Sequence, residues 1–322
     1  MESTTNDLTL ALETSLEEET LTSLLLNGVL NLRLFSARCR ESQAQALVNQ
    51  DYVLVEAQRD ASSLCFCVCD GVGNSYRGEF AARYLGKRLV AWLQTLPVFQ
   101  WAYTSWKSQL DTLLRTWASE AHQEVLQLDL PDGVPDLVRE VLEELRTTQG
   151  SETVFLCGRI NRAYTARPTE KPQTIEVFLC WMGNVTAHLF VSSDNCIVLG
   201  GDDGNVGGWS TGRGPRGRLH TWHTGLTTLD QLIVHTDGLN RIQRQLPELS
   251  DEGLQRLARR LLSLPQNDDM TALILQWISQ NPADAQTAED IQTAKEGENW
   301  HDQPVTIATI PGHASPDRES IL

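Results

Sequence analysis

The chain has 322 residues, of which 42 are acidic and 26 are basic, giving a formal net charge of −16. Its apolar fraction of 41% and charged fraction of 21% are those of a globular protein, and its length is enough to bury a substantial core. The acidity argues against a nucleic-acid binder or a polybasic membrane-surface protein, and no apolar run reaches the roughly 20 residues needed to cross a bilayer.

Much of the acidic charge lies at the two ends of the chain. Residues 1–20 and residues 281–322 each carry a net charge of −6, which leaves about −4 for the rest. Because both ends also show little apolar periodicity, we expect acidic, disordered tails over 1–27 and 281–322 and one folded domain over 28–280. The first residues have neither the basic nor the apolar region of a secretory signal, so the sequence favours a cytoplasmic protein.

The first part of the body combines strands and helices. β-Branched and aromatic residues predict neighbouring strands at 52–56 and 63–69, and the second strand carries Cys65, Cys67 and Cys69 on one face. The spacing of these cysteines does not fit a zinc site, and we interpret them as small buried apolar residues. Apolar residues three and four positions apart then predict three helices, at 79–93, about 101–128 and about 134–147.

The second part of the body is mostly β. The order of its elements is not the regular strand–helix alternation of a Rossmann or flavodoxin design, and it predicts an α+β domain with sheets layered against helices. The expected elements are strands at 152–161, 175–182, 185–191 and 195–199, a glycine-rich loop at 200–217, a strand at 231–236, a helix at about 251–263 and a strand at 270–278.

Aspartates recur at the ends of the predicted strands. Asp51 opens the first strand, Asp70 ends the second, Asp237 ends the next-to-last, and Asp268 and Asp269 precede the last. Carboxylates at the ends of buried strands gather at one rim of a sheet, where they repel one another unless a cation lies among them. Oxygen ligands without a nearby His or Cys suit Mg²⁺ or Mn²⁺. Each Asp-Gly pair taken alone is also an ordinary turn.

These residues resemble the motifs of a known family, the metal-dependent serine/threonine phosphatases of the 2C type (PPM-type). The resemblance extends from about Asn49 to Gln276 and rests on short motifs in the family's order. The motifs are Asn49-Gln50-Asp51, Asp70-Gly71-Val72-Gly73-Asn74 continuing to Gly78-Glu79, Gly150-Ser151-Glu152-Thr153 with one residue inserted, Thr236-Asp237-Gly238 at the end of an apolar strand, and Asp268-Asp269-Met270-Thr271.

The resemblance implies a four-layer α/β/β/α sandwich of two mainly antiparallel sheets flanked by helices, with a metal site at one end between the sheets. It implies hydrolysis of phosphoserine or phosphothreonine in proteins by a water that bridges two Mn²⁺ or Mg²⁺ ions. Asp70 would bridge the ions, with the Gly71 carbonyl as a further ligand. Asp237 and Asp268 would complete the shell of the first ion, and Asp51 would act nearby through water. Asp70 and Asp237 are thus the implied catalytic residues.

Three positions depart from the family pattern. Ala46 stands where the family carries its phosphate-binding arginine, and Gln50 replaces a carboxylate. Asn184 stands where the family has an aspartate that helps to hold a third metal, so the resemblance supports two ions rather than three. The implied partner is a phosphorylated protein, such as the target of a serine/threonine kinase, and we expect a monomer that binds neither nucleic acid nor membranes.

Arg213, Arg216 and Arg218 lie in the glycine-rich loop, about where the family carries a mobile flap. They are candidates for binding the substrate phosphate, with solvated surface arginines as the other interpretation. A pseudophosphatase of the same fold, which binds a phosphoprotein without efficient hydrolysis, is the alternative function that the departures favour and the retained metal ligands oppose. A haloacid-dehalogenase-type phosphatase is disfavoured, because it needs a second aspartate where Val72 stands.

Overall fold

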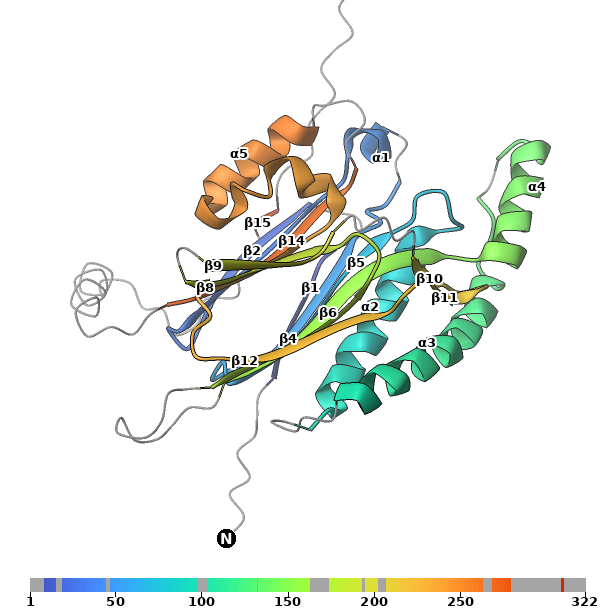
Figure 1. Cartoon of the computed structure of the whole chain (residues 1–322). Coiled ribbons are helices and arrows are strands. Elements are labelled where there is room, and N and C mark those ends of the chain that lie inside the picture. The colour runs from blue at the N-terminus through green and yellow to red at the C-terminus, as the bar shows by residue number, and fades with distance from the viewer. Residues whose placement is uncertain are drawn as a thin grey trace, which may run out of the picture.

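Two antiparallel sheets pack face to face, and helices cover both outer faces (Figure 1). The structure is a computed structural model that describes residues 9–15, 19–44, 47–97, 103–131, 133–162, 174–192, 195–201, 207–262, 268–278 and 308–309. The expected α+β class, a sandwich of two mainly antiparallel sheets flanked by helices, is confirmed.

Sheet A has eight strands, all paired antiparallel. Its longest strand, β6, pairs with β10 at its start and with β7 along the rest of its length, so the short hairpin β10–β11 lies beside β7 on the same edge. The strands are β1 (Thr9–Glu13), β4 (Tyr52–Gln58), β5 (Ser63–Gly71), β6 (Glu152–Arg162), β7 (Ile175–Met182), β10 (Gly208–Ser210), β11 (Gly214–Arg216) and β12 (His220–Leu226).

Sheet B has seven strands in the order β15-β2-β3-β14-β13-β8-β9, again all antiparallel. Its central strands are apolar on both faces, because one face packs on sheet A and the other on helices. The strands are β2 (Thr20–Leu26), β3 (Leu30–Ala37), β8 (Thr186–Ser192), β9 (Asn195–Gly200), β13 (Gln231–His235), β14 (Met270–Trp277) and β15 (Ala308–Thr309).

Helices form the two outer layers. α2 (Gly78–Thr95) and α3 (Tyr103–Val125) cover sheet A, whereas α5 (Asp251–Leu262) covers sheet B together with the 3₁₀ turns η2 (Asp237–Ile242) and η3 (Leu246–Glu248). α1 (Arg40–Ala44) follows β3, and α4 (Asp136–Glu144) continues into the π-helical turn η1 (Leu145–Gln149) at one side of the molecule in Figure 1. Within the described ranges, no helix combines the length and the apolar character that a membrane span requires.

The alternation of side chains along β5 divides the core. Phe66 and Val68 face sheet B in the central core, whereas Cys65, Cys67 and Cys69 face α2 in the outer core. The predicted shared face of the three cysteines is therefore confirmed. Because the same alternation continues to the end of the strand, Asp70 lies on the face that is directed toward sheet B.

Six of the seven cysteines are buried, and only Cys196 is exposed. Burial raises the pKa of Cys65 to about 12, and it raises the pKa of Cys67 well above that of an ordinary thiol. We therefore expect Ellman's reagent to modify one thiol rapidly at pH 8 in the native protein and all seven in guanidinium chloride, since only an accessible thiolate reacts. Rapid modification of several thiols in the native protein would contradict this burial.

The N-terminal boundary of the fold differs from the expected one. Residues 1–27 were expected to be a disordered tail, but β1 lies within this range and pairs with β4, and β2 pairs with β3 along its whole length. The physical reason is that these short segments carry alternating or continuous apolar residues. They let β1 form the edge strand of sheet A and β2 a strand of sheet B between β15 and β3, despite the acidic residues around them. In the expected C-terminal tail, the structure describes only residues 308–309, as β15.

Candidate metal centre

Strand ends from both sheets meet at one end of the sandwich, and this brings the aspartates together. In sheet A, β4 begins beside the end of β5, so Asp51 and Asp70 are neighbours across the strand pair. In sheet B, β13 ends beside the start of β14, so Asp237 lies near Asp268. The sequence-based expectation that carboxylates at strand ends share one rim agrees with this placement.

Asp51 is buried, with 1% of its surface exposed, and it joins the two sheets. Its Oδ2 accepts a hydrogen bond from Thr236 Oγ1 at 2.8 Å, and its backbone N–H donates to Asn49 Oδ1 at 2.9 Å. Burial raises the pKa of Asp51 well above the ordinary value, and the charges of Asp269 and Asp268 raise it further. The two hydrogen bonds fix Asp51 between the start of β4 and the end of β13.

Asp70 is the half-buried carboxylate on which the others converge. Burial raises its pKa well above the ordinary value, and Asp51, Asp237, Asp268 and Asp269 each raise it further through charge repulsion. The backbone carbonyl of Asp70 accepts a hydrogen bond from a neighbouring strand, but no described residue donates one to its carboxylate. The Asp70 carboxylate therefore lies among other carboxylates and has oxygen lone pairs that no described residue uses.

Asp237 contributes a second carboxylate with a free oxygen. Its Oδ2 accepts a hydrogen bond from Asn184 Nδ2 at 2.8 Å, whereas its Oδ1 is buried and has no hydrogen-bond partner among the described residues. Asp268 lies just before β14, the strand that pairs with β13, and its Oδ1 accepts a hydrogen bond from the backbone N–H of Asp269 at 2.8 Å. Burial raises the pKa of both Asp237 and Asp268.

Gly71 lets the chain close tightly behind Asp70. A Cβ atom at this position would lie 2.6 Å from the backbone carbon of Gly78 and 2.7 Å from the carbonyl oxygen of Gln50. Both atoms are backbone and cannot move aside, so only glycine fits here. The contact fixes the loop between β5 and α2 against the segment that leads to Asp51.

Asp269 has a structural role that sequence reasoning did not assign. It is buried, with 3% of its surface exposed, and its two oxygens accept hydrogen bonds from the backbone N–H groups of Cys39 at 2.7 Å and Gln50 at 2.9 Å. These bonds tie the end of β3 and the turn before β4 to the start of β14. Its position next to Asp268 was the available signal, but the sequence does not say which of the two turns inward.

The donor set fits a hard divalent cation that keeps part of its water shell. It consists of carboxylate and carbonyl oxygens, it contains the unpartnered Asp237 Oδ1, and its members raise one another's pKa. In the part of the chain that the structure describes, no three His, Cys, Asp or Glu side chains lie together in a way that could by itself hold a metal ion, so the carboxylates form an open site. Mg²⁺ and Mn²⁺ suit such an open site, since they bind through a few carboxylates and several waters.

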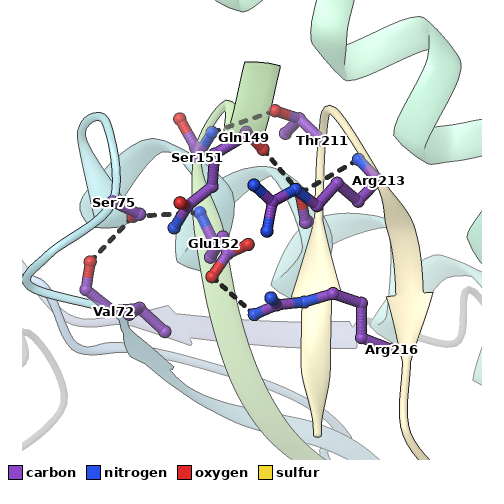
Figure 2. A network of polar contacts seen from close by, with 9 residues as sticks. Val72, Ser75, Gln149, Ser151, Glu152, Thr211, Arg213 and Arg216 are labelled. Atoms are coloured by element: carbon purple, nitrogen blue, oxygen red, sulfur yellow. Dashed lines mark hydrogen bonds and ion pairs between the residues drawn. The ribbon is translucent and has the colours of Figure 1, made fainter. Parts of the chain in front are cut away.

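Part of the glycine-rich loop forms the hairpin β10–β11, and its three arginines differ in exposure and in contacts. Arg216 lies in β11, and its Nη2 forms an ion pair with Glu152 Oε2 at 2.7 Å, as Figure 2 shows. Arg213 and Arg218 are exposed, and Arg213 is held through its backbone N–H, which donates to Ser210 Oγ at 3.0 Å. Of the three candidates, only Arg216 has its guanidinium fixed by a described residue at this end of the sandwich.

Glu152 is the residue at this end that sequence reasoning missed, because the motif around it was interpreted as containing an insertion. The pairing of β5 with β6 is unbroken and ends with Gly71 opposite Thr153, so Glu152 is the residue directly before the last paired one. The side chain of Glu152 is 3% exposed, and its Oε1 has no hydrogen-bond partner among the described residues.

Asn184 contacts the centre directly, which makes the Asn184→Asp variant informative. The change replaces an amide donor by a second carboxylate against Asp237 Oδ2, so we expect the metal-free protein to lose about 1–2 kcal/mol of stability. Mn²⁺ is then expected to stabilise the variant more than the wild type, because it neutralises the added charge. Thermal unfolding in EDTA and in Mn²⁺ measures both effects, and equal melting temperatures for the two proteins in EDTA would contradict the contact.

Two surface hollows lie beside the start of α2 and share Arg77, Glu79 and Arg83. Their volumes are about 350 and 590 Å³, and neither is lined by the aspartates of the centre. The second hollow is lined also by Val48, three residues before Asp51. The hollows therefore adjoin the chain segments that carry the site without containing the site.

Comparisons with solved structures identify the fold. Two variants of a bacterial serine phosphatase, with lysine or glutamate in place of one arginine, match with TM-scores of 0.51 and 0.50 at 15% and 16% identity. The matches cover 78% and 77% of this chain and 98% of the phosphatase in each case. The serine/threonine phosphatase Stp1 from Staphylococcus aureus also matches, over 80% of this chain and 97% of its own, at 16% identity and a TM-score of 0.47.

No family model and no curated protein matches the sequence. At such low identities the structural likeness establishes the fold, which is that of bacterial serine phosphatases, in agreement with the resemblance that the sequence motifs carry.

Proposed function

We propose that this chain is a metal-dependent phosphatase that hydrolyses phosphoserine and phosphothreonine in proteins. The observation that carries the proposal is the meeting of Asp70 from sheet A with Asp237 and Asp268 from sheet B, in a site that offers only oxygen donors. Two Mn²⁺ or Mg²⁺ ions would supply an activated water and positive charge for the phosphate. The phosphatase fold of the structural neighbours supports the same conclusion.

Each residue has a defined task in this proposal. Asp70, with the carbonyl of Gly71, and Asp237 with Asp268 would hold the cations, and the buried Asp51 keeps the cluster in place through Thr236. Arg216 would bind the phosphate oxygens of the substrate, because its guanidinium carries several N–H donors in a planar fork. The protein thus contributes position and charge, and no side chain forms a covalent intermediate with the phosphoryl group.

The test is Mn²⁺-dependent hydrolysis of a phosphothreonine peptide by the wild type, Asp70→Asn and Asp237→Asn. We expect release of phosphate by the wild type that depends on metal and is lost in both variants. Wild-type activity no higher than that of Asp70→Asn at saturating metal would contradict the proposed enzymatic function. In that case binding of the same peptide without hydrolysis would identify a pseudophosphatase, whose partner would be a phosphorylated protein.

A further inference from the structure

Glu152 and Arg216 lie on the same face of sheet A as Asp70. Along β6, Val154 and Leu156 pack in the core between the sheets, so alternation directs Glu152 to this side as well. Glu152 pairs with Ser210 of β10, which continues into the hairpin partner β11. Arg216 is the last residue of β11 and lies opposite Gly208. Because Gly208 and Ser210 are two residues apart in β10, Arg216 lies on the same face as Ser210 and Glu152.

The guanidinium of Arg216 reaches across β10 to β6. Neighbouring strands are about 5 Å apart, and β6 is the direct neighbour of β5, so the ion pair stands about one strand spacing from the strand of Asp70. The ion pair therefore lies beside the strand that ends with Asp70 and Gly71, at the same end of the sandwich as the aspartates.

Glu152 is fixed, whereas Arg216 is partly open to solvent. The Glu152 side chain is 3% exposed and that of Arg216 is 39% exposed. The backbone N–H of Glu152 donates to Ser75 Oγ at 3.1 Å, and this hydroxyl donates to the carbonyl oxygen of Val72 at 2.7 Å (Figure 2). The loop that follows Asp70 and Gly71 is thereby joined to Glu152, which in turn holds Arg216.

The ion pair leaves donors free for a ligand. It uses one of the five N–H groups of Arg216, and the side chain is 39% exposed, although its Nε is buried and has no partner among the described residues. Without Arg216, Glu152 would be a further buried carboxylate in an acidic site. Together the two side chains carry no net charge, so the pair does not add to the repulsion there. A buried acid that anchors a half-exposed arginine is the arrangement expected where a guanidinium must be held ready for an anion.

We infer that Glu152 is a positioning residue, which holds Arg216 in the orientation that binds the substrate phosphate. The inference rests on the proposed function, and it gives this chain a phosphate-binding arginine although Ala46 replaces the one that its motifs would imply. Glu152 acts through Arg216 and does not touch the phosphate, because its one paired oxygen is directed at the guanidinium.

The experiment compares Arg216→Ala, Arg216→Lys, Glu152→Gln and the double variant Glu152→Gln/Arg216→Ala with the wild type. We expect Arg216→Ala to raise KM for a phosphothreonine peptide and Ki for inorganic phosphate about tenfold, as for loss of one charge-assisted hydrogen bond, with a smaller change in kcat. Glu152→Gln is expected to raise both constants several-fold. The double variant is expected to equal Arg216→Ala, because Glu152 has no effect without its arginine.

The matched control is another arginine–glutamate pair, Arg88 with Glu120, whose N–O distance is 3.1 Å and which joins α2 to α3. Arg88→Ala is expected to leave KM and Ki unchanged. If Glu152→Gln lowers the melting temperature but leaves both constants at the wild-type values, the pair only supports the fold and the inference is wrong. If Glu152→Gln does not fold, Arg216→Lys decides, since wild-type KM and Ki in that variant would also overturn the inference.

A second readout separates this inference from the proposed function. If the wild type does not hydrolyse the peptide, binding of inorganic phosphate and of the phosphopeptide is measured by calorimetry in Mn²⁺. Binding by the wild type that weakens about tenfold in Arg216→Ala and several-fold in Glu152→Gln would sustain the inference while the enzymatic function fails. Absence of binding by the wild type would overturn both.

Discussion

Asp70→Asn is expected to stabilise the metal-free protein, to abolish its stabilisation by Mn²⁺ and to lower hydrolysis by roughly 1,000-fold or more. The variant removes a half-buried carboxylate whose pKa is raised by burial and by the charges of Asp51, Asp237, Asp268 and Asp269, so repulsion within the cluster falls. We expect a gain of about 1–3 kcal/mol in EDTA. The same change removes the carboxylate that both ions would share, so activity is lost. Because the variant is expected to be more stable than the wild type without metal, this loss does not come from unfolding.

Thermal unfolding in EDTA and in Mn²⁺ measures the stability part of this prediction. A ligand at about 100 times its Kd stabilises the native state by about 2.7 kcal/mol, which corresponds to a rise of several degrees in Tm for the wild type. Asp60→Asn is a suitable control, because Asp60 lies in the turn between β4 and β5, at the opposite end of this strand pair. An equal rise in Tm for Asp70→Asn and the wild type would contradict a metal centre at Asp70.

Trp209→Ala is expected to cost about 3–5 kcal/mol of stability. Trp209 is fully buried in the core between sheet A and its helices, and its ring stacks on Tyr84 at a centroid distance of 6.1 Å. Its Nε1–H donates to the carbonyl oxygen of Leu114 at 2.8 Å, so the variant leaves a cavity and also removes this hydrogen bond. Urea unfolding measures the loss.

The same variant is expected to weaken substrate binding, because Trp209 anchors the hairpin that carries Arg216. Trp209→Phe is the conservative comparison, since it keeps most of the ring volume and loses the hydrogen bond to Leu114, and we expect it to cost about 1–2 kcal/mol. A free energy of unfolding for Trp209→Ala within 1 kcal/mol of the wild type would show that this ring does not hold the hairpin.

The parts of the fold that the sequence predicts well are those with one strong local pattern. The alternation of apolar residues along 63–69 and the helical spacing of 79–93 place β5 and α2 almost correctly. β1 and β2 were missed because the acidic composition around them was given more weight than their short apolar patterns. β10 and β11 were interpreted as loop, because three-residue strands among glycines have no period that a sequence can show.

The residues of the candidate site also fall into those that the sequence identifies and those that it does not. Asp51, Asp70, Asp237 and Asp268 were identifiable, because each follows or precedes an apolar strand and belongs to a short motif. The contact of Asn184 with Asp237 joins residues 53 positions apart, and that of Arg216 with Glu152 joins residues 64 apart. Which side chains meet across such separations depends on strand register, and one sequence does not determine the register of non-local pairs.

The division of the centre between two sheets has a consequence for the lifetime of the native state. Asp70 belongs to sheet A, Asp237 and Asp268 belong to sheet B, and the hydrogen bond from Thr236 to Asp51 already crosses between them. An ion held by both groups acts as a removable cross-link, which closes only after both sheets have formed and faced each other. Chelation is therefore expected to accelerate unfolding far more than it slows refolding, so that metal supply would set how long each folded molecule survives.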